Sequence, residues 1–405
     1  MTDRHAEMFA RLGSEQVADR VATIRELETL LSGQNGGHDA IVDRLVEFVR
    51  GNVAHPWLNR MAPMMLWKRA AVRPAPDVQA ALSVVARRTS EQWLDLRRLD
   101  LRGADLSEAR FAHARLAESD LHDAYLGGVD LFRANIGRAF LARANLSDAN
   151  LTYATMNSST LREANLRGAR LSHTYLRGAD LTGADCEGAE LQYADVYGSE
   201  LEETRLANAN LSYALFERAT LERADLRSAQ VSYASLTGAN MKNARLNDAI
   251  LHFAELKNAE LVEADLTGAH LGNAHLDRTN LSYARLTGAD LRLATLVRAR
   301  ARYANLRGAR LTGARLGVAD LERADLRDAN LSDTYMFRTR LRDADLAGAR
   351  LDAADMWEVD LTGAWGLTAE QLSTAWIHKS VRLDPELAEH PVVKARIDET
   401  EHRFD

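Results

Sequence analysis

The sequence predicts an all-β solenoid, in which a parallel β-helix of square coils occupies most of the chain. The prediction rests on a strict repeat. From Leu101 to Leu361 every fifth residue is apolar, and 42 of these 53 positions are leucine, without insertion or deletion. The residue two places earlier is alanine at 42 of the 53 positions. A period of five fits neither the 3.6-residue period of an α-helix nor the two-residue period of a half-buried strand.

A chain that turns a corner every five residues explains this period. Each segment then directs one large and one small side chain inward and three outward, and four segments close a coil of 20 residues. The same motif accordingly returns at multiples of 20: LTYA at Leu151, LQYA at Leu191, LSYA at Leu211 and VSYA at Val231. We expect about 13 coils, stacked ~4.8 Å apart, with leucine packed on leucine inside.

The residue before each leucine is often Asp or Asn, as in "GADLTGAD" and "RADLRDANL". This pattern, A(D/N)LXX, resembles that of the pentapeptide-repeat family and covers residues 96–365. The resemblance implies a right-handed quadrilateral β-helix, in which the central leucine and the alanine before it face inward. The inward positions derived from the period agree with those that the family implies.

Residues 1–95 lack the repeat, and we interpret them as a helical module. Apolar residues recur there at helical spacing in three stretches: Val17, Val21, Ile24, Leu27 and Leu31; Ile41, Leu45, Phe48 and Val49; and, after the sequence PAPD, Val78, Ala81, Leu82 and Val85. We expect the module to cap an open edge of the solenoid, with a partner-binding role as the alternative. The cluster of Met61, Met64 and Met65 is interpreted as core filler.

Residues 366–405 follow the repeat and are expected to form a C-terminal capping helix and a polar tail. Thr368 is predicted to be the N-cap of a helix that covers the last coil with Leu372, Ala375 and Trp376. Some members of the family dimerise through C-terminal helices, so a homodimer is left open. The apolar set in the tail is small for that role: Val392, Val393 and Ile397.

The composition indicates a soluble, cytoplasmic protein, and the excess of arginine over lysine is typical of a GC-rich bacterial genome. The net charge of −7 is modest for 405 residues and does not require a nucleic-acid partner. The single cysteine, Cys186, excludes an internal disulfide. The N-terminus has no signal-peptide run, and no window approaches the ~18 consecutive apolar residues of a membrane span, so no membrane partner is expected.

One outward column places aromatic rings at the same point of successive coils. Its members are Tyr153, His173, Tyr193, Tyr213, Tyr233 and Phe253. One interpretation is a stacked ladder that stabilises the sheet by ~0.2–1 kcal/mol per pair. The other is a partner-binding strip, because a continuous exposed aromatic patch tends to mark a contact surface. A shorter pair, Tyr283 and Tyr303, is predicted on the opposite face.

Charge gives a second candidate site. Residues 291–310 contain six arginines and no acid, a basic collar that either binds a phosphate-rich ligand or is simply solvated: Arg292, Arg298, Arg300, Arg302, Arg307 and Arg310. The repeat as a whole, residues 96–365, has 34 Arg and Lys against 38 Asp and Glu, a net charge of −4. Direct binding of nucleic acid is therefore not expected.

No constellation typical of catalysis stands out, so neither a catalytic residue nor a cofactor is expected. His252, His270 and His275 fall near one edge of adjacent coils, but no further ligand completes a metal site. Cys186, at an inward position, is interpreted as an inert core thiol. Ala301 takes the place of a leucine, which predicts either a gap filled by a neighbour or a pinched coil.

The sequence favours a non-catalytic protein that binds another macromolecule along the solenoid. The resemblance implies a protein partner, DNA gyrase or topoisomerase IV, in a protective or self-resistance role. Family members that protect type II topoisomerases resemble B-DNA in width and negative charge, and a net of −4 is small for such a mimic. Two alternatives stay open: a tailoring or accessory enzyme of a biosynthetic pathway that uses the aromatic face, and a protein–protein scaffold.

Overall fold

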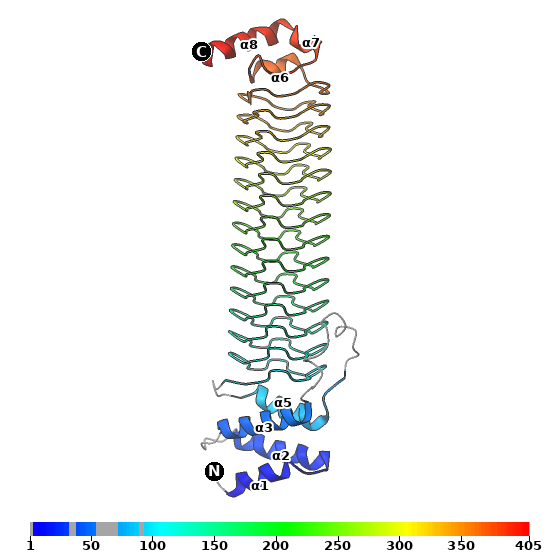
Figure 1. Ribbon diagram of the computed structural model, residues 1–405, viewed down its shortest axis with the longest axis vertical. Helices are drawn as coiled ribbons and strands as arrows, with labels where there is room; N and C mark the ends of the chain where they lie inside the picture. Colours follow the sequence, from blue (N-terminus) through cyan, green and yellow to red (C-terminus); the bar gives the residue numbers. More distant parts are fainter. Residues whose placement is uncertain (1–2, 32–37, 54–71, 89–92, 405) are drawn as a thin grey trace. The chain divides into compact units, whose positions relative to one another are not determined.

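A computed structural model describes residues 3–31, 38–53, 72–88 and 93–404 (Figure 1). The chain divides into two units, Met1–Glu200 and Leu201–Asp405, which are described separately. Unit 1 contains the N-terminal helices and the first part of the repeat, and unit 2 contains the rest of the repeat and the C-terminal helices. The methionine cluster predicted as core filler, Met61, Met64 and Met65, lies outside the described residues.

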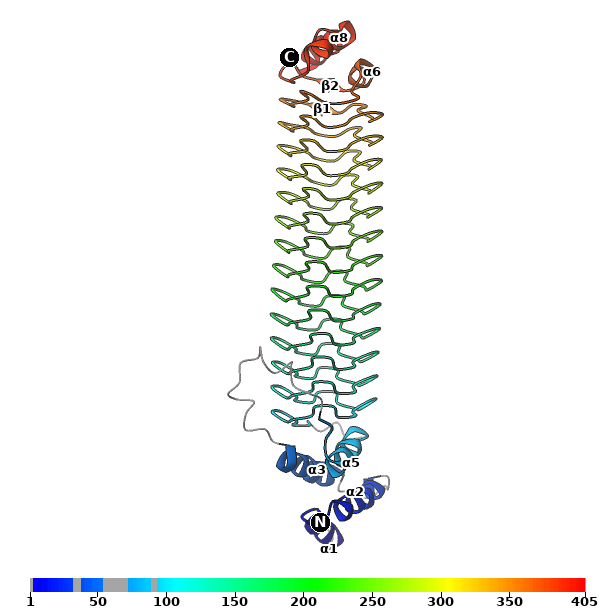
Figure 2. The same ribbon diagram turned by 90° about the vertical axis from the view of Figure 1, so that its right-hand side faces the viewer.

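In both units the repeat winds into stacked coils of 20 residues (Figure 2). We number the residues of each five-residue segment from the leucine, so that segment 101–105 supplies positions 1 to 5. Position 5 of each segment forms a parallel bridge to the residue 20 places further on, as between Asp95 and Arg115 in unit 1 and between Arg205 and Asp225 in unit 2. Four segments therefore complete one coil, as the period of five predicts.

Backbone hydrogen bonds explain why each segment has five residues. In segment 226–230, the N–H groups of Leu226 and Ser228 donate to carbonyls of the next coil at 2.7 and 3.0 Å. Gln230 donates to the previous coil at 2.9 Å, and Ala229 closes a tight turn on the carbonyl of Leu226 at 3.1 Å. One N–H of the five, that of position 2, is left for a side chain, because a buried or half-buried donor needs a partner.

Where Asp or Asn precedes the leucine, its side chain can supply that partner. The N–H of Arg227 donates to Oδ1 of Asp225 at 3.2 Å, and the N–H of Ser212 donates to Oδ1 of Asn210 at 3.1 Å. This bond from an Asp or Asn side chain to the backbone two residues on is an Asx-turn. This bond gives a physical reason for the Asp or Asn in the sequence pattern. Their short side chains place an oxygen acceptor at the turn, whereas leucine and alanine have no acceptor in the side chain.

The core of each unit consists of the side chains at positions 1 and 4. Between residues 96 and 361 none of the apolar residues at these positions is more than 3% exposed. Where threonine replaces the alanine at position 4, its buried hydroxyl donates to a backbone carbonyl at 2.7–2.8 Å, as in Thr174, Thr279 and Thr339. The substitutions therefore leave no buried hydroxyl without an acceptor at these three sites.

Ala301 occupies its leucine position without distorting the coil. Its N–H donates to the next coil at 2.7 Å, between the 2.6 and 2.8 Å of Leu281 and Leu321, which hold the same place in the coils on either side. The side chain is 2% exposed. The coil is therefore not pinched at this point, and the smaller side chain is accommodated inside an unchanged backbone.

Four described helices precede the coils of unit 1: α1 (Asp3–Arg11), α2 (Val17–Leu31), α3 (His38–Val53) and α5 (Pro76–Ala86). The apolar residues predicted for α2 and α3 are buried at Ile24, Leu27 and Leu45, among others. Helix α5 begins at Pro76, inside the PAPD sequence instead of after it, because proline fits the first turn of a helix. Helix α1 is not predicted from the sequence.

The helices supply acceptors to the first coil. The N–H groups of Asp100, Asp105 and Arg110 have no earlier coil to bond to, and they donate to Val53 O, Gln79 Oε1 and Ala86 O at 3.0, 3.0 and 2.8 Å. Figure 2 shows α3 and α5 beside this edge. These bonds support the proposal that residues 1–95 act as a cap, since an unpaired edge invites pairing with another strand.

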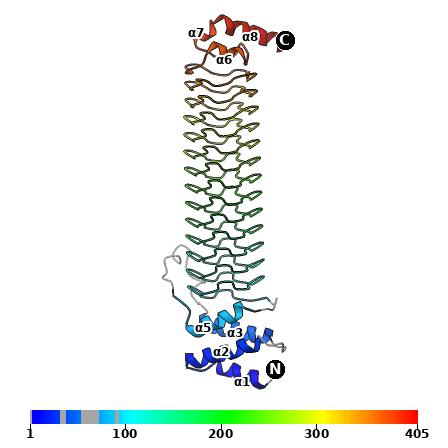
Figure 3. The same cartoon turned by 180° about the vertical axis from the view of Figure 1, so that it is seen from behind.

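The C-terminal segment contains α6 (Ala369–Ser373), α7 (Pro385–Ala388) and α8 (Pro391–Phe404), beyond the last coils of unit 2 (Figure 3). Thr368 is the N-cap of α6, and its hydroxyl accepts from the N–H of Gln371 at 3.2 Å. The helix is shorter than predicted. Trp376 instead starts strand β2 (Trp376–Ile377), which pairs in parallel with β1 (Asp355–Met356) and so prolongs the coil.

Helix α8 is fixed to its own chain. Val393 is fully buried, Arg396 Nε donates to the carbonyl of Ala375 at 2.6 Å, and Thr400 accepts from the N–H of Ile377 at 3.3 Å. Val392 stays 46% exposed. A homodimer through this helix stays a prediction, with little apolar surface left for it. Among the described residues, no helix combines the length and apolarity needed to cross a bilayer.

The inward position can be tested by placing a charge in the core. Leu226→Asp is expected to abolish cooperative unfolding of unit 2, because Leu226 is 1% exposed and an unpaired buried carboxylate costs several kcal/mol. Arg227→Gln, one residue away and exposed, should leave the urea midpoint nearly unchanged. Equal tolerance of both substitutions in circular dichroism melts would contradict the assignment of inward and outward positions.

The small side chain of Ala301 offers a stabilising substitution. Ala301→Leu restores the leucine column between Leu281 and Leu321 and is expected to raise the free energy of unfolding by ~0.5–2 kcal/mol, as cavity-filling changes do. Ala304→Leu is the control, because position 4 holds a small residue and overpacking there costs ~1–3 kcal/mol. Denaturant unfolding measures both, and destabilisation by Ala301→Leu would show that the site has no room.

Candidate protein-binding surface

The rings of the predicted aromatic column sit at position 3 of their segments, where the backbone is left-handed. From Arg98 to Gly363 every position 3 has a positive φ, in 40 non-glycine and 14 glycine residues. With the bond from position 4 to position 1, this geometry is that of a type II turn, which favours Gly or Asn at its third residue. A tyrosine there, as Tyr153 with φ of 60°, is uncommon for a bulky side chain.

In unit 1 the rings of Tyr153, His173 and Tyr193 form a parallel stack, the unit 1 stack. Ring centroids are 4.6 Å apart between Tyr153 and His173 and 4.9 Å apart between His173 and Tyr193, with planes inclined by 6° and 3°. Phe132 meets Tyr153 edge-on at 6.0 Å, and the guanidinium of Arg133 lies 5.6 Å from the Tyr153 centroid. These contacts close one side of the stack.

In unit 2 the rings of Tyr213, Tyr233 and Phe253 form the unit 2 stack. Their centroids are 4.9 and 5.0 Å apart, with planes inclined by 2° and 4°. Asn273, at the same point of the next coil, ends the series of rings. The three residues of this stack remain 42–48% exposed. The binding role of both stacks stays a prediction.

The surroundings of both stacks are poor in charge. We call the outward residues of segments 151–155, 171–175 and 191–195 in unit 1, and of 211–215, 231–235 and 251–255 in unit 2, the aromatic face. Within it, Asp195 is the one residue with a formal charge in unit 1 and Glu255 the one in unit 2. The other flanking residues are mostly Ser and Thr, and Tyr175 and Leu215 add exposed apolar surface at 48% and 39%.

The second predicted ring pair, Tyr283 and Tyr303, also stacks, with centroids 5.0 Å apart and planes inclined by 3°. It differs from the aromatic face in its neighbours. The Tyr303 hydroxyl accepts from the Arg323 guanidinium at 2.8 Å, and the charges of Arg302 and Glu322 lie in the adjacent column, where the two form an ion pair. Tyr283 and Tyr303 therefore form a stack with the same geometry as the stacks of the aromatic face, but with charged neighbours.

The six arginines predicted as a basic collar differ in their ion pairing. Arg292 makes a two-bond ion pair with Asp290 at 2.8 and 2.6 Å, and this bonding raises the pKa of the Arg292 guanidinium. The other paired members bind acids of neighbouring coils: Arg300 with Glu260, Arg302 with Asp320 and Glu322, and Arg307 with Asp328. Within residues 201–404, Arg298 and Arg310 form no ion pair at such short range, although the charge of Arg310, after the Arg292 bonds, helps to lower the pKa of the Asp290 carboxyl.

The three histidines considered as metal ligands are not brought together. His252 and His270 lie 5.9 Å apart between ring centroids, and His275 faces Glu255 at 3.8 Å. Among the residues that the structure describes, no group of three or more His, Cys, Asp or Glu side chains could hold a metal ion.

The structure also shows a buried pair that the sequence does not reveal. His122 and Asp120 hold outward positions, yet both side chains are 0% exposed, and Nδ1 of His122 lies 2.5 Å from Oδ1 of Asp120. The sequence signal, an Asp two places before a His, occurs within the ordinary repeat pattern. Because neither group reaches solvent, the pair cannot act on a ligand in this conformation.

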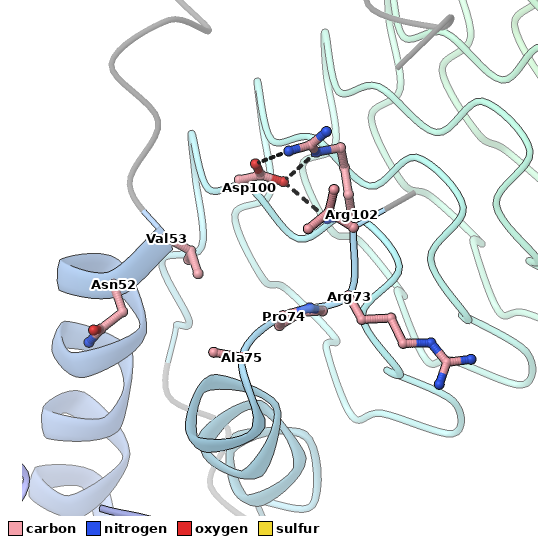
Figure 4. A pocket seen from close by; sticks show the side chains of 8 residues that line it. Asn52, Val53, Arg73, Pro74, Ala75, Asp100 and Arg102 are labelled. Atoms are coloured by element: carbon pink, nitrogen blue, oxygen red, sulfur yellow. Dashed lines mark hydrogen bonds and ion pairs between the residues drawn. The ribbon is translucent and has the colours of Figure 1, made fainter. Parts of the chain in front are cut away.

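A pocket of about 340 Å³ lies in unit 1 between the end of α3, residues 72–75 and the first coil (Figure 4). Its two central charges neutralise each other, because Arg102 donates to both carboxylate oxygens of Asp100 at 2.8 and 2.7 Å. This pairing raises the pKa of the Arg102 guanidinium. Figure 4 shows Arg73 extending away from the pocket. The Asp100 and Arg102 charges are therefore satisfied by each other, and Arg73 is the remaining charged residue of the lining.

Sequence comparison identifies the class of protein. Eight copies of the pentapeptide-repeat profile match the chain, at residues 95–131, 130–168, 169–206, 204–243, 224–261, 259–298, 304–343 and 329–364. The chain therefore belongs to the pentapeptide-repeat family, whose members fold as right-handed β-helices. The family resemblance and the β-helix predicted from the sequence are confirmed. No curated protein matches the chain.

Two solved structures of the family illustrate its range. HetL, involved in heterocyst differentiation regulation in the cyanobacterium Nostoc sp. strain PCC 7120, is 32% identical over 60% of this chain and 90% of its own, with a TM-score of 0.22. QnrB1, a plasmid-mediated fluoroquinolone resistance protein, is 19% identical over 56% of this chain and 95% of its own, with a TM-score of 0.31. At these TM-scores the similarity supports no inference about function.

The core position of Cys186 makes a further test possible. Burial, and secondly the nearby Asp185 charge, raise the pKa of the Cys186 thiol to about 12, so at pH 8 the folded protein holds it as an unreactive thiol. Labelling by a disulfide reagent is expected to be slow in native protein and complete within the dead time in urea. Fast native labelling would show that unit 1 opens at this coil or that Cys186 is not inward.

Proposed function

We propose that this protein is a non-catalytic binding protein and that its aromatic face contacts another protein. The observation that supports this most is the low charge around the rings. Charged residues make up 27% of the chain, yet each unit has a single one on this face. Protein interfaces show the same combination at their centre, because aromatic residues are enriched and charged residues depleted there.

Stacking alone does not explain this composition. A ladder that only stabilises the coils needs ring-to-ring contact, which Tyr283 and Tyr303 achieve equally well among charged neighbours. It does not need Ser, Thr, Leu and Tyr in the flanking columns. The tyrosines of the aromatic face are also 40–50% exposed. A row of half-exposed rings with uncharged borders offers a contiguous apolar surface to a partner.

The partner that we propose is a type II topoisomerase, DNA gyrase or topoisomerase IV, and this part rests on family membership. QnrB1, which shares the family, is a fluoroquinolone resistance protein. Mimicry of DNA by negative charge has little support in the surface of this chain, since arginines neutralise many acids. Arg223, for example, pairs with Glu202, Glu203 and Glu222. Contact through the aromatic face is the mechanism that we propose instead.

The proposal is tested with a double substitution on the unit 2 stack, Tyr213→Asn and Tyr233→Asn. Asparagine is chosen because it tolerates a positive φ better than alanine does. The wild type at micromolar concentration is expected to inhibit gyrase supercoiling or to relieve its quinolone inhibition. The double variant should bind the topoisomerase at least tenfold more weakly, which corresponds to ~1.4 kcal/mol, and should retain its fold.

The matched control is Tyr283→Asn with Tyr303→Asn, which removes an equally stacked pair in the same unit. Both double variants should lose similar stability, a few tenths to ~1 kcal/mol per ring, while only the first loses binding. Equal binding by both variants would make the aromatic face a stabilising ladder. A folded wild type without effect on gyrase or topoisomerase IV would remove the topoisomerase from the proposal.

A further inference from the structure

A shallow depression of about 530 Å³ lies in unit 2 on the segments that follow the aromatic face around the coil. Four basic side chains border it: Arg278 and Arg298 from position 3 of successive coils, Arg315 from the neighbouring corner, and Lys257. Asp277 is the one acidic residue in its lining. The lining therefore has a formal charge of +3, in a protein whose total is −7.

The arginines of this depression differ from most others in unit 2. Arg223, Arg292 and Arg338 illustrate the common case, in which a guanidinium binds a carboxylate of its own or a neighbouring coil at close range. Within residues 201–404, no hydrogen bond or ion pair engages the side chains of Arg278, Arg298 and Arg315. Three exposed guanidiniums without a carboxylate partner thus border one hollow.

The acid in the lining does not neutralise them. Asp277 Oδ2 accepts from the Thr295 hydroxyl at 3.0 Å, and its Oδ1 accepts from the N–H of Val297 at 3.0 Å. These bonds hold the carboxylate toward the backbone of the next coil. The Lys257 ammonium group forms an ion pair at 3.0 Å with the carboxylate of Glu255, a residue that lies outside the lining. The positive charge available to a ligand therefore comes mainly from the three arginines.

We propose that this depression binds a small ligand through its phosphate groups. A guanidinium donates two parallel hydrogen bonds to phosphate and cannot lose its proton at ordinary pH, so it suits phosphate better than other basic groups do. Arg278 and Arg298 lie one above the other on coils ~4.8 Å apart, and Arg315 faces the same hollow. The arrangement lets two or three guanidiniums share one di- or triphosphate chain.

This site is independent of the proposed topoisomerase contact. Arg298 is the single residue of the sequence-predicted collar that belongs to it, and Arg278, Arg315 and Lys257 lie outside the collar. Sequence reasoning could place Arg278 below Arg298 from the period of 20. It could not show that both lack an acidic partner or that Arg315 reaches the same hollow.

Isothermal titration calorimetry of the whole protein tests the proposal with two probes, tripolyphosphate and ATP. Both are expected to bind with a dissociation constant of about 1 mM or tighter, and more weakly as ionic strength rises toward ~0.15 M. Arg298→Gln with Arg315→Gln should weaken both probes at least tenfold. Because tripolyphosphate has no ring, its binding shows that the site recognises phosphate and not a nucleobase.

The control variant is Arg218→Gln with Arg342→Gln, which removes the same charge from exposed arginines of unit 2 outside the depression. Like the test variant, it changes one residue of positive φ, since Arg218 and Arg298 have φ of 58° and 60°. Near-wild-type affinity is expected. The proposal is wrong if both variants lose affinity equally, if ATP binds and tripolyphosphate does not, or if only duplex DNA binds through these arginines.

Discussion

One constraint governs this protein: every fifth residue must close a tight turn whose third residue has a positive φ. The turn aligns three of the five N–H groups with carbonyls of adjacent coils and leaves a fourth for its own turn. Where Asp or Asn precedes the leucine, an Asx bond satisfies the fifth, as Asp225 does for the N–H of Arg227. If this local geometry failed, neither the coil-to-coil bridges nor the inward packing of leucine on leucine could form, because both follow from the register it sets.

The same register makes side chains 20 residues apart into neighbours. Rings then stack, as Tyr213 does on Tyr233, and opposite charges pair, as Arg338 does with Glu358 at 2.7 Å. A column of the sequence thus becomes a strip of surface with one chemistry. Function in such a protein resides in the outward columns, since the inward ones are filled by buried side chains, mostly leucine and alanine, in both units.

Two outward regions break the common pattern of paired charges, in opposite ways. The aromatic face has almost no charge, which suits contact with a protein. The depression around Arg278, Arg298 and Arg315 has charge without partners, which suits a phosphate ligand. Most other arginines of unit 2 form ion pairs with acids of their own or nearby coils, and exposed pairs of this kind contribute little to stability. The departures from pairing are therefore the informative part of the surface.

The sequence by itself determined the square coil, its inward positions, the stacked rings and Thr368 as a helix cap, because a strict period fixes the backbone register. The tertiary structure alone decided the burial of His122 with Asp120, the early end of α6 and the separation of the collar arginines into paired and unpaired ones. The physical reason is that the period places each Cα but not the rotamer of a long outward side chain. Which carboxylate an arginine reaches depends on neighbours from three coils at once.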